Sequence, residues 1–265
     1  MTHHGLPNGP LAVVKIGGRP QADPALPAAL AECWRATDGR LVVVHGGGDA
    51  VSELQRARGV EPRFVGGRRV TTPADLDVLR MALSGLANKQ LVAALRGAGV
   101  PAFGCSGEDG ALLTATRTAD AALGAVGVPA RVDAAVLDAL LRAGCCPVIS
   151  PVSADADAAG SALNVNGDDA AAAVAAALGA AELFFLADVP GVLVDGAPVA
   201  ELDPAGARAL VADGTAAGGM AAKLDAALVA LGAGVRRVRV GDVAALADPS
   251  RGTAVVATAG VHSIA

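Results

Sequence analysis

The segment Leu11-Ala12-Val13-Val14-Lys15-Ile16-Gly17-Gly18 decides how the chain folds. A continuous apolar run that ends in glycine is typical of a strand buried on both faces of a parallel sheet. Lys and Arg together number 21, yet lysine occurs only at positions 15, 89 and 223. A compact ammonium group approaches a phosphate end-on more readily than a broad guanidinium group does. Lys15 and Lys223, both near glycine pairs, are therefore candidate phosphate ligands, with chance retention as the alternative, above all for Lys89.

Apolar runs and helical patterns alternate along the whole chain, which favours an α/β fold. We expect strands at 11–16, 41–45, 101–104, 146–150, 182–187, 236–240 and 253–257. We expect helices at 25–36, 49–58, 73–96, 134–143, 168–178, 204–213, 219–232 and 242–248, and hairpins at 62–71 and 191–200. The helix at 73–96 has a clear start signal, because Thr72 is a good N-cap, Pro73 suits the first helical position and Asp75 brings a carboxylate.

Composition excludes several classes of protein. With 53% hydrophobic and 18% charged residues over 265 positions, the chain is not disordered. A net charge of −5 gives no electrostatic footprint for nucleic acid or an anionic membrane. The apolar stretch 170–187 resembles a membrane span, but Gly179 and Glu182 interrupt it, so a helix followed by a strand is expected.

The start of the chain and the cysteines indicate a cytoplasmic protein. The first ten residues have no targeting pattern and are expected to form a short disordered tail. The cysteines contain no C-x-x-C pair and are expected to be free thiols: Cys33, Cys105, Cys145 and Cys146.

Three glycine clusters lie at predicted junctions between strands and helices: Gly17-Gly18, Gly46-Gly47-Gly48 and Gly218-Gly219. Open α/β sheets bind ligands at the carboxyl ends of their strands. Glycine lets the backbone approach a phosphate, and the free N–H groups of a following helix favour an anion. The three clusters and two lysines together predict a polyphosphate site.

Other nucleotide and hydrolase motifs are absent. No lysine follows a glycine as a P-loop requires, and no G-x-G-x-x-G opens a helix after a strand. His45 and the glycines after it are similar to an esterase oxyanion loop, but there is no G-x-S-x-G elbow. We therefore expect a structural role for His45 at the end of its strand, and not a role as a base.

A further cluster follows a strand at Asn164-Val165-Asn166-Gly167-Asp168-Asp169. Alternation places Asn164 and Asn166 on one face. The two aspartates open a helix, where a carboxylate is also favoured as a cap.

Taken in order, these motifs are similar to those of one known family. They are Val14 to Gly18, His45 to Gly48, Gly67 to Thr71, Asn164 to Asp168, Asp188 to Gly191, Gly218 to Lys223 and Gly252-Thr253, with Asn88-Lys89 on the long helix. The set resembles the amino acid kinase family, and within it the members that phosphorylate N-acetyl-L-glutamate. The resemblance implies a three-layer αβα sandwich with an open, mostly parallel eight-stranded sheet. It further implies an acyl-amino-acid-binding and dimerisation lobe at residues 1–178 and an ATP-binding lobe at residues 179–265.

The resemblance also implies a role for individual residues. Lys15 and Lys223 would contact the transferring phosphoryl group, with Asp168 orienting both. The acyl amino acid would be bound by Gly47, Gly48, Arg69, Asn164 and Asn166. ATP would be bound by Gly17, Gly18, Asp188, Val189, Pro190, Gly191, Val192, Leu193, Thr215, Ala216 and Ala217. The implied reaction transfers the γ-phosphoryl group of MgATP to the side-chain carboxylate of N-acetyl-L-glutamate in arginine biosynthesis, with Mg²⁺ held mainly by the nucleotide and water.

Three positions depart from the family pattern. Arg68 replaces a leucine beside Arg69, which the resemblance implies is the clamp on the substrate α-carboxylate. Gly167 replaces a commoner Ala, and Asp169 replaces a commoner Thr or Gln. The alternatives are kinases for N-succinylglutamate or carrier-linked aminoadipate, more distant kinases for aspartate, carbamate or UMP, and a non-catalytic amino-acid or nucleotide sensor.

The resemblance also bears on assembly and regulation. Arginine-inhibited relatives carry an extra helix before the first strand, whereas glycine and proline at Gly5, Pro7, Gly9 and Pro10 oppose one here. We therefore expect a homodimer that is insensitive to L-arginine.

Overall fold

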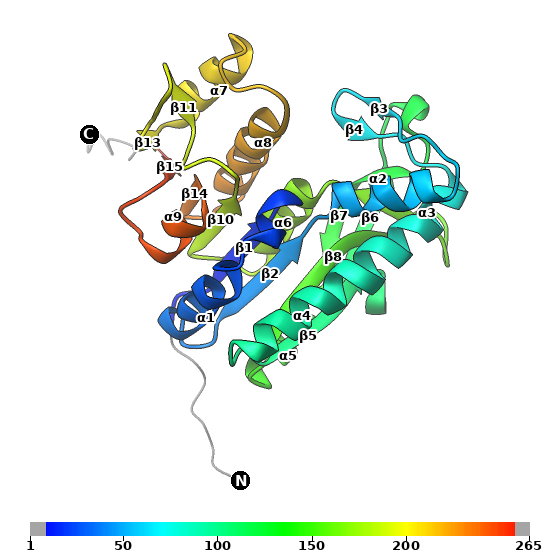
Figure 1. Ribbon diagram of the computed structural model, residues 1–265, viewed down its shortest axis with the longest axis horizontal. Helices are drawn as coiled ribbons and strands as arrows, with labels where there is room; N and C mark the ends of the chain where they lie inside the picture. Colours follow the sequence, from blue (N-terminus) through cyan, green and yellow to red (C-terminus); the bar gives the residue numbers. More distant parts are fainter. Residues whose placement is uncertain (1–8, 258–265) are drawn as a thin grey trace, which may run out of the picture.

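The computed structural model describes residues 9–257 (Figure 1). Most of the expected N-terminal tail, with His3 and His4, lies outside these residues, as does His262. The strands of the main sheet are β1 (Ala12–Ile16), β2 (Leu41–His45), β5 (Ala102–Gly107), β6 (Leu113–Arg117), β7 (Val126–Val132), β8 (Cys146–Asp155), β9 (Ala162–Val165), β10 (Glu182–Leu186), β13 (Glu201–Leu202), β14 (Arg237–Gly241) and β15 (Thr253–Val256). The two expected hairpins are present as β3 (Phe64–Val65) with β4 (Arg68–Arg69), and β11 (Leu193–Val194) with β12 (Ala197–Pro198).

Helices follow most strands, at or close to the expected positions. They are α1 (Leu26–Ala36), α2 (Gly48–Ala57), α3 (Pro73–Leu79), α4 (Asn88–Gly97), α5 (Ala134–Arg142), α6 (Gly167–Ala177), α7 (Pro204–Ala212), α8 (Gly218–Gly232) and α9 (Val243–Ala247). Short helical turns are η1 (Arg19–Ala22), η2 (Arg80–Ala87), η3 (Asp109–Ala111) and η4 (Ala121–Leu123).

The expected α/β class is confirmed, and parallel strands form the centre of the sheet. Across the described residues the order is β13-β15-β14-β10-β1-β2-β8-β6-β7-β9, with β5 also paired to β8. Strands β2, β1, β10 and β14 are mutually parallel, and Lys15 lies beside Val44 of β2 and Phe185 of β10. The carboxyl ends of these strands, and the glycine clusters that follow them, therefore meet at one edge.

The predicted count of eight strands is wrong, because the described sheet contains 11. Three strands had no expected counterpart, β6, β7 and β13, and β9 was expected only as the strand that leads into the cluster Asn164 to Asp169, without bounds. Only two residues of β6 and two of β7 are buried, so these strands lack the continuous apolar run of the central strands. Strand β8 also runs on to Asp155, five residues beyond the end of the strand expected at 146–150, and its pairing with both β6 and β9 closes a ring of four strands through β7. The sheet is thus partly closed at this end.

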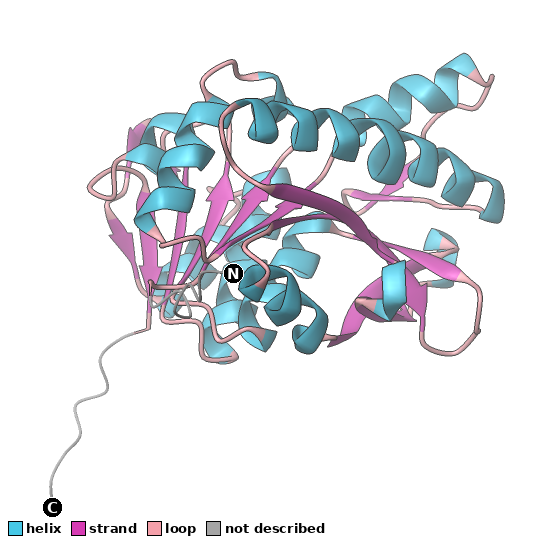
Figure 2. Cartoon of the chain, turned by 90° about the horizontal axis from the view of Figure 1, so that it is seen from below, coloured by secondary structure: helices cyan, strands magenta, loops and turns pink. Residues whose placement is uncertain are grey.

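Two apolar cores lie on the two faces of the sheet, as Figure 2 shows with helices on both sides of the strands. Successive residues of β1 serve different cores: Val13 packs with residues of α6 and α8, and Val14 packs with residues of α1, α4 and α9. Because both faces of β1 are covered, successive residues of this strand must be apolar, which explains the apolar run from Leu11 to Val14.

The helix predicted at 73–96 is present but changes its winding. The capping box at Thr72 and Asp75 is confirmed, and the helix passes from α3 through the π-helical segment η2 into α4. Such segments often occur at functional sites. Leu83 of η2 lies so close to Gly47 that a Cβ atom on that glycine would be 2.8 Å from its Cδ2.

Two smaller predictions are also confirmed. The apolar stretch 170–187 forms α6 and β10, and no helix between residues 9 and 257 is long and apolar enough to cross a membrane. All four cysteines are free thiols. Burial raises the pKa of Cys33 to about 11 and of Cys105 to about 12, so both stay protonated near neutral pH.

Candidate active site

A carboxylate between two lysines forms the centre of the site. Asp168, in the first turn of α6, has one oxygen 2.9 Å from the Lys15 ammonium of β1 and the other 3.6 Å from that of Lys223 in α8. All three side chains are largely buried, with exposed fractions of 7%, 8% and 13% respectively. Two ammonium groups and one carboxylate leave one positive charge in excess, which suits an anionic ligand.

The pKa of Lys223 is lowered, chiefly by burial and then by the charge of Lys15, while Asp168 opposes the shift. Burial disfavours the charged ammonium, and a second cation nearby adds repulsion. An incoming phosphate would relieve both penalties, because it supplies the missing negative charge. The cluster is therefore arranged to gain stability when it binds an anion.

Glycine-rich junctions surround this cluster. Gly47 precedes α2 and adopts a φ of 149°, and a Cβ atom there would collide with Leu83, so the position requires glycine. Gly218 opens α8 with a φ of 53°. The first N–H groups of α2, α6 and α8 have no partner within their own helix, which makes each helix start a potential anion contact.

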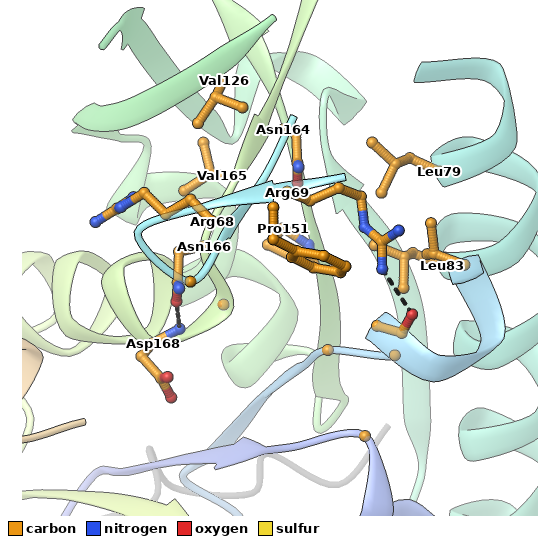
Figure 3. A pocket seen from close by; sticks show the side chains of 18 of the residues that line it. Arg68, Arg69, Leu79, Leu83, Val126, Pro151, Asn164, Val165, Asn166 and Asp168 are labelled. Atoms are coloured by element: carbon orange, nitrogen blue, oxygen red, sulfur yellow. Dashed lines mark hydrogen bonds between the residues drawn. The ribbon is translucent and has the colours of Figure 1, made fainter. Parts of the chain in front are cut away.

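The first cavity, of about 230 Å³, lies on one side of the cluster (Figure 3). It brings together Lys15 and Asp168 with every predicted acyl-binding residue: Gly47, Gly48, Arg69, Asn164 and Asn166. Gly18 lines it too, along with the apolar side chains of Leu79, Leu83 and Val126. A cavity that combines charged and amide side chains with apolar ones suits a small organic anion.

Arg69 is held by partners that the sequence did not reveal. Its guanidinium group donates to the Gln55 side chain, to the Ser52 hydroxyl at 2.8 Å and to the Gly48 carbonyl at 2.8 Å. Gln55 in turn donates to Asp75. Ser52 and Gln55 are three residues apart and so share one face of the helix predicted at 49–58. The sequence alone could not link that face to Arg69, because the link depends on the packing of β4 against α2.

The two asparagines differ in what they do. Asn164 donates to the Thr71 hydroxyl at 2.9 Å, which ties β9 to the end of the β3–β4 hairpin. Asn166 is the N-cap of α6, since its side-chain oxygen accepts from the Asp168 backbone N–H at 2.7 Å. The cap of α6 is therefore Asn166, whereas the sequence had suggested one of the two aspartates, Asp168 or Asp169.

A second cavity, of about 360 Å³, lies on the other side of the lysine–aspartate cluster. It is lined by Gly17, Gly18, Asp188, Val189 and Lys223, with Arg19, Pro20, Leu186, Ala187, Gly219 and Met220. Gly18 lines both cavities, and Lys223 of this cavity reaches Asp168 of the first. The two cavities thus meet at the charged cluster.

Several predicted nucleotide-binding residues lie outside that cavity. Gly191 and Val192 pack against Thr253, and Ala216 is buried in a loop that bonds to α7. Pro190, Leu193, Thr215 and Ala217 also do not line it. These residues are close in sequence to residues that line the cavity, but they do not line it themselves.

Comparison with known proteins identifies the family. A sequence model of the amino acid kinase family matches residues 10–242. The chain belongs to the amino acid kinase family. A curated acetylglutamate kinase of Chloroflexus aurantiacus is 44% identical over 240 residues, covering 90% of this chain and 94% of the relative. One from Geobacillus kaustophilus is 44% identical over 225 residues, covering 84% and 86%.

Solved structures agree with this assignment. The crystal structure of smu.665 from Streptococcus mutans matches with a TM-score of 0.82 at 28% identity, covering 93% of this chain and 98% of that one. An N-acetylglutamate synthase from Neisseria gonorrhoeae, solved with coenzyme A and N-acetyl-glutamate, matches with a TM-score of 0.79 at 27% identity, covering 96% and 61%. A carbamate kinase from Giardia lamblia shares the fold, with a TM-score of 0.72 at 15% identity, covering 95% and 99%.

Two departures of this amino acid kinase from the family pattern pair with each other. Arg68, on the β3–β4 hairpin, donates to Asp169 of α6 at 2.9 Å. In Figure 3 its guanidinium group points away from that of Arg69. The second terminal nitrogen of Arg68 is buried and has no hydrogen-bond partner within residues 9–257. The pair ties the hairpin to the helix that carries Asp168.

We expect the loss of Asp169 to lower the free energy of unfolding more than the loss of Arg68. Asp169→Thr strands an arginine whose other terminal nitrogen is already unpaired, and so lowers the free energy of unfolding by about 1–2 kcal/mol. Arg68→Leu leaves a carboxylate at a helix start, where it is favoured, and costs about 0.5 kcal/mol or less. Urea unfolding of both variants and the double variant measures this. Equal costs that add fully in the double variant would show that the two side chains do not stabilise each other.

Proposed function

We propose that this protein is an acetylglutamate kinase, which transfers the γ-phosphoryl group of ATP to the side-chain carboxylate of N-acetyl-L-glutamate. The observation that carries the proposal is the position of Lys15, Asp168 and Lys223 where two cavities meet. Phosphoryl transfer needs two substrates to face each other across a cluster of positive charge. The names of the curated relatives support the choice of reaction.

The acceptor needs no general base. A glutamate side chain with an ordinary pKa of about 4.3 is ionised at neutral pH, so its oxygen can attack phosphorus directly. His45 is unsuited to such a task, because its pKa is lowered to about 4, chiefly by burial. Catalysis then consists of positioning the two substrates and stabilising charge.

Lys15 and Lys223 stabilise the charge that develops on the equatorial and leaving oxygens in a loose transition state. Asp168 holds both ammonium groups in place and limits their mutual repulsion. Further hydrogen-bond donors come from the backbone N–H groups of Gly17 and Gly18 on one side and of Gly47 and Gly48 on the other. The position of a backbone donor does not depend on a side-chain conformation. The new bond forms between phosphorus and the acceptor carboxylate oxygen, the bond from phosphorus to the leaving oxygen of ATP breaks, and the products are ADP and an acyl phosphate.

Mg²⁺ fits this site as an ion carried by the nucleotide. Residues 9–257 contain no group of three or more metal-ligating side chains, and both Asp168 oxygens already face lysines. When bound with the nucleotide, the ion would neutralise part of the charge on the phosphate oxygens. The remaining stabilisation falls to the two lysines.

The acyl amino acid is bound in the first cavity. Arg69 spends three of its five N–H groups on Gln55, Ser52 and Gly48, and two remain for the substrate α-carboxylate. Asn164 and Asn166 line the same cavity as Arg69 and Lys15 and would bind the acylated amino group and the reacting carboxylate. The 27% identical synthase solved with N-acetyl-glutamate supports an acylglutamate here.

ATP is bound in the second cavity. Gly17, Gly18, Asp188 and Val189 line it, while Pro190 to Leu193 and Thr215 to Ala217 lie further along the same loops. The loops that carry Asp188 to Leu193 and Thr215 to Ala217 belong to the proposed ATP lobe, residues 179–265. Gly17 and Gly18 come from the proposed acyl-amino-acid lobe, residues 1–178, as do all residues that line the first cavity. A cytoplasmic location and a place in arginine biosynthesis stay predictions from the sequence.

N-succinylglutamate is the second candidate acceptor, because Arg68 adds a cation to the wall of the first cavity. That cation would suit an additional carboxylate on the acyl group. Asp169 already pairs with it, however, so the acetyl compound is favoured.

We also propose a homodimer. Strand β5 pairs only with β8 among the described strands, which leaves one edge open, and Phe103 on it is 47% exposed. Met81 and Leu86 of η2 are 43% and 58% exposed. Light scattering is expected to give twice the chain mass, and a monomer at micromolar concentration would contradict the dimer. Insensitivity to L-arginine stays a prediction, because it was inferred from residues 1–10, and residues 1–8 lie outside the described part of the chain.

The substrate assignment predicts that N-acetyl-L-glutamate supports MgATP-dependent ADP release far better than glutamate, aspartate or N-acetylaspartate. Arg69, which would hold the α-carboxylate, and the amide groups of Asn164 and Asn166 in the same cavity favour an acylated glutamate. A coupled assay of ADP release, run with N-succinylglutamate in the same panel, measures the preference. Equal or better turnover with another acceptor would replace the proposed substrate.

The mechanism predicts that Lys15→Ala and Lys223→Ala each lower kcat by about 10²–10³, because each removes a preorganised charge from the transition state. Lys89→Ala, the matched control, has a much smaller effect. In the unsubstituted enzyme kcat/KM is expected to fall as pH rises through the lowered pKa of Lys223, since kcat/KM reports groups of the free enzyme and only the ammonium form contributes charge. A folded Lys223→Ala enzyme with full activity would rule out this mechanism.

A further inference from the structure

His45 stands at the carboxyl end of β2, directly before the three glycines, and is fully buried. Burial lowers its pKa to about 4, so the ring is neutral near pH 7. A neutral imidazole has one N–H donor and one acceptor nitrogen. Nδ1 lies 2.9 Å from the Gly46 carbonyl oxygen, which can only accept, so Nδ1 carries the proton.

The other ring nitrogen is held from the long helix. Nε2 of His45 accepts from the Asn88 side-chain amide at 3.0 Å, and the same amide donates to the Val148 carbonyl at 2.9 Å. Lys89 fixes the amide's orientation by donating to its oxygen at 3.0 Å and to the Gly104 carbonyl at 3.1 Å. The third lysine of the chain thus supports the ring of His45 from outside the site.

A second donor reaches the same carbonyl from another element. Gln21, in the turn η1 after Gly17 and Gly18, donates to the Gly46 oxygen at 2.8 Å. The Gly46 carbonyl is therefore held by two N–H groups, one from His45 and one from Gln21. Neither side chain lines the first cavity.

The geometry of the peptide bond carries this constraint to the cavity. No peptide bond in residues 9–257 is cis, and in a planar trans peptide the C=O and the following N–H point in opposite directions. Fixing the Gly46 oxygen on one side therefore aims the Gly47 N–H to the other side. Gly47 lines the first cavity, and within residues 9–257 its N–H has no hydrogen-bond acceptor.

We propose that His45 and Gln21 are positioning residues, which hold the Gly46 carbonyl and thereby aim the Gly47 N–H at the phosphoryl group during transfer. The proposal rests on the proposed function, in which Gly47 and Gly48 contact the phosphoryl group. A backbone donor aimed in advance at developing charge contributes to kcat, because the alignment is not needed for ground-state binding. Asn88 and Lys89 act one step further out, on the orientation of the ring.

Gln21 is the residue to test, because it is only half-buried and its replacement leaves the core intact, whereas buried His45 variants risk misfolding. Gln21→Met keeps the chain length and removes the donor; it is expected to lower kcat about 5- to 10-fold, a fraction of the loss on deleting such a donor outright, with both KM values within about 2-fold. Gln90→Met is the matched control, since Gln90 is exposed on α4, and it is expected to leave kcat unchanged. Unchanged kcat in Gln21→Met, or a change in KM alone, would overturn the proposal.

Gln21→Glu supplies a readout that a structural role would not move. At pH 8 its carboxylate faces the Gly46 oxygen without a proton to donate, and kcat is expected to be lower than in Gln21→Met. As pH falls toward 5, protonation restores an O–H donor, so kcat relative to the unsubstituted enzyme is expected to rise. A ratio that is flat from pH 5 to 8 would contradict the proposal.

The variants are compared with whichever acceptor the substrate panel identifies. If N-acetyl-L-glutamate is not that acceptor, the proposed substrate is wrong while the test of Gln21 stands. If the acceptor is confirmed and the Gln21 variants behave as their controls, only the positioning role is wrong.

Discussion

The ion pairs of Asp168 with Lys15 and Lys223 are the interaction on which the rest of the site depends. The lysines come from distant parts of the chain, β1 and α8, and without a carboxylate between them two buried ammonium groups would repel. Asp168 is itself fixed by the start of α6, where Asn166 caps the helix. The cluster therefore joins the N-terminal strand, the central helix and the C-terminal helix at one point between two cavities.

The parallel sheet makes this convergence possible. Because β1, β2 and β10 run in the same direction, the loops that leave their carboxyl ends all reach one edge. The glycines at that edge supply backbone donors, and the arrangement of those donors depends on groups behind them, such as His45 and Gln21 at the Gly46 carbonyl. In the proposed mechanism, the charged cluster and the aligned backbone act together on the migrating phosphoryl group.

Local signals in the sequence were sufficient for the central elements. The apolar run at Leu11 to Ile16 and the capping box at Thr72 predicted a buried strand and a helix start because each is decided by neighbouring residues. The ordered motifs also predicted that Lys15, Asp168, Arg69 and Asn164 belong to one site, and the structure brings them together. The half-exposed strands β6 and β7 were missed, because polar residues, a glycine and a proline interrupt their apolar residues, and such segments resemble loops when the pairing partner is unknown.

Contacts between distant segments lay beyond the sequence. Gln21 and Gly46, Arg68 and Asp169, or Lys89 and Gly104 become neighbours only when strands and helices are packed, and no spacing rule relates them. For the same reason the sequence did not show that Val192 and Ala216, two of the predicted ATP-binding residues, have side chains buried in the core.

The most direct test of the account is a crystal structure of the protein with MgADP, aluminium fluoride and N-acetyl-L-glutamate. The fluoride group stands in for the transferring phosphoryl group. The account predicts that it lies between the two cavities, with the ammonium groups of Lys15 and Lys223 and the Gly47 N–H within hydrogen-bonding distance and Asp168 still contacting both lysines. A fluoride group bound away from this cluster, or contacted by neither lysine, would contradict it.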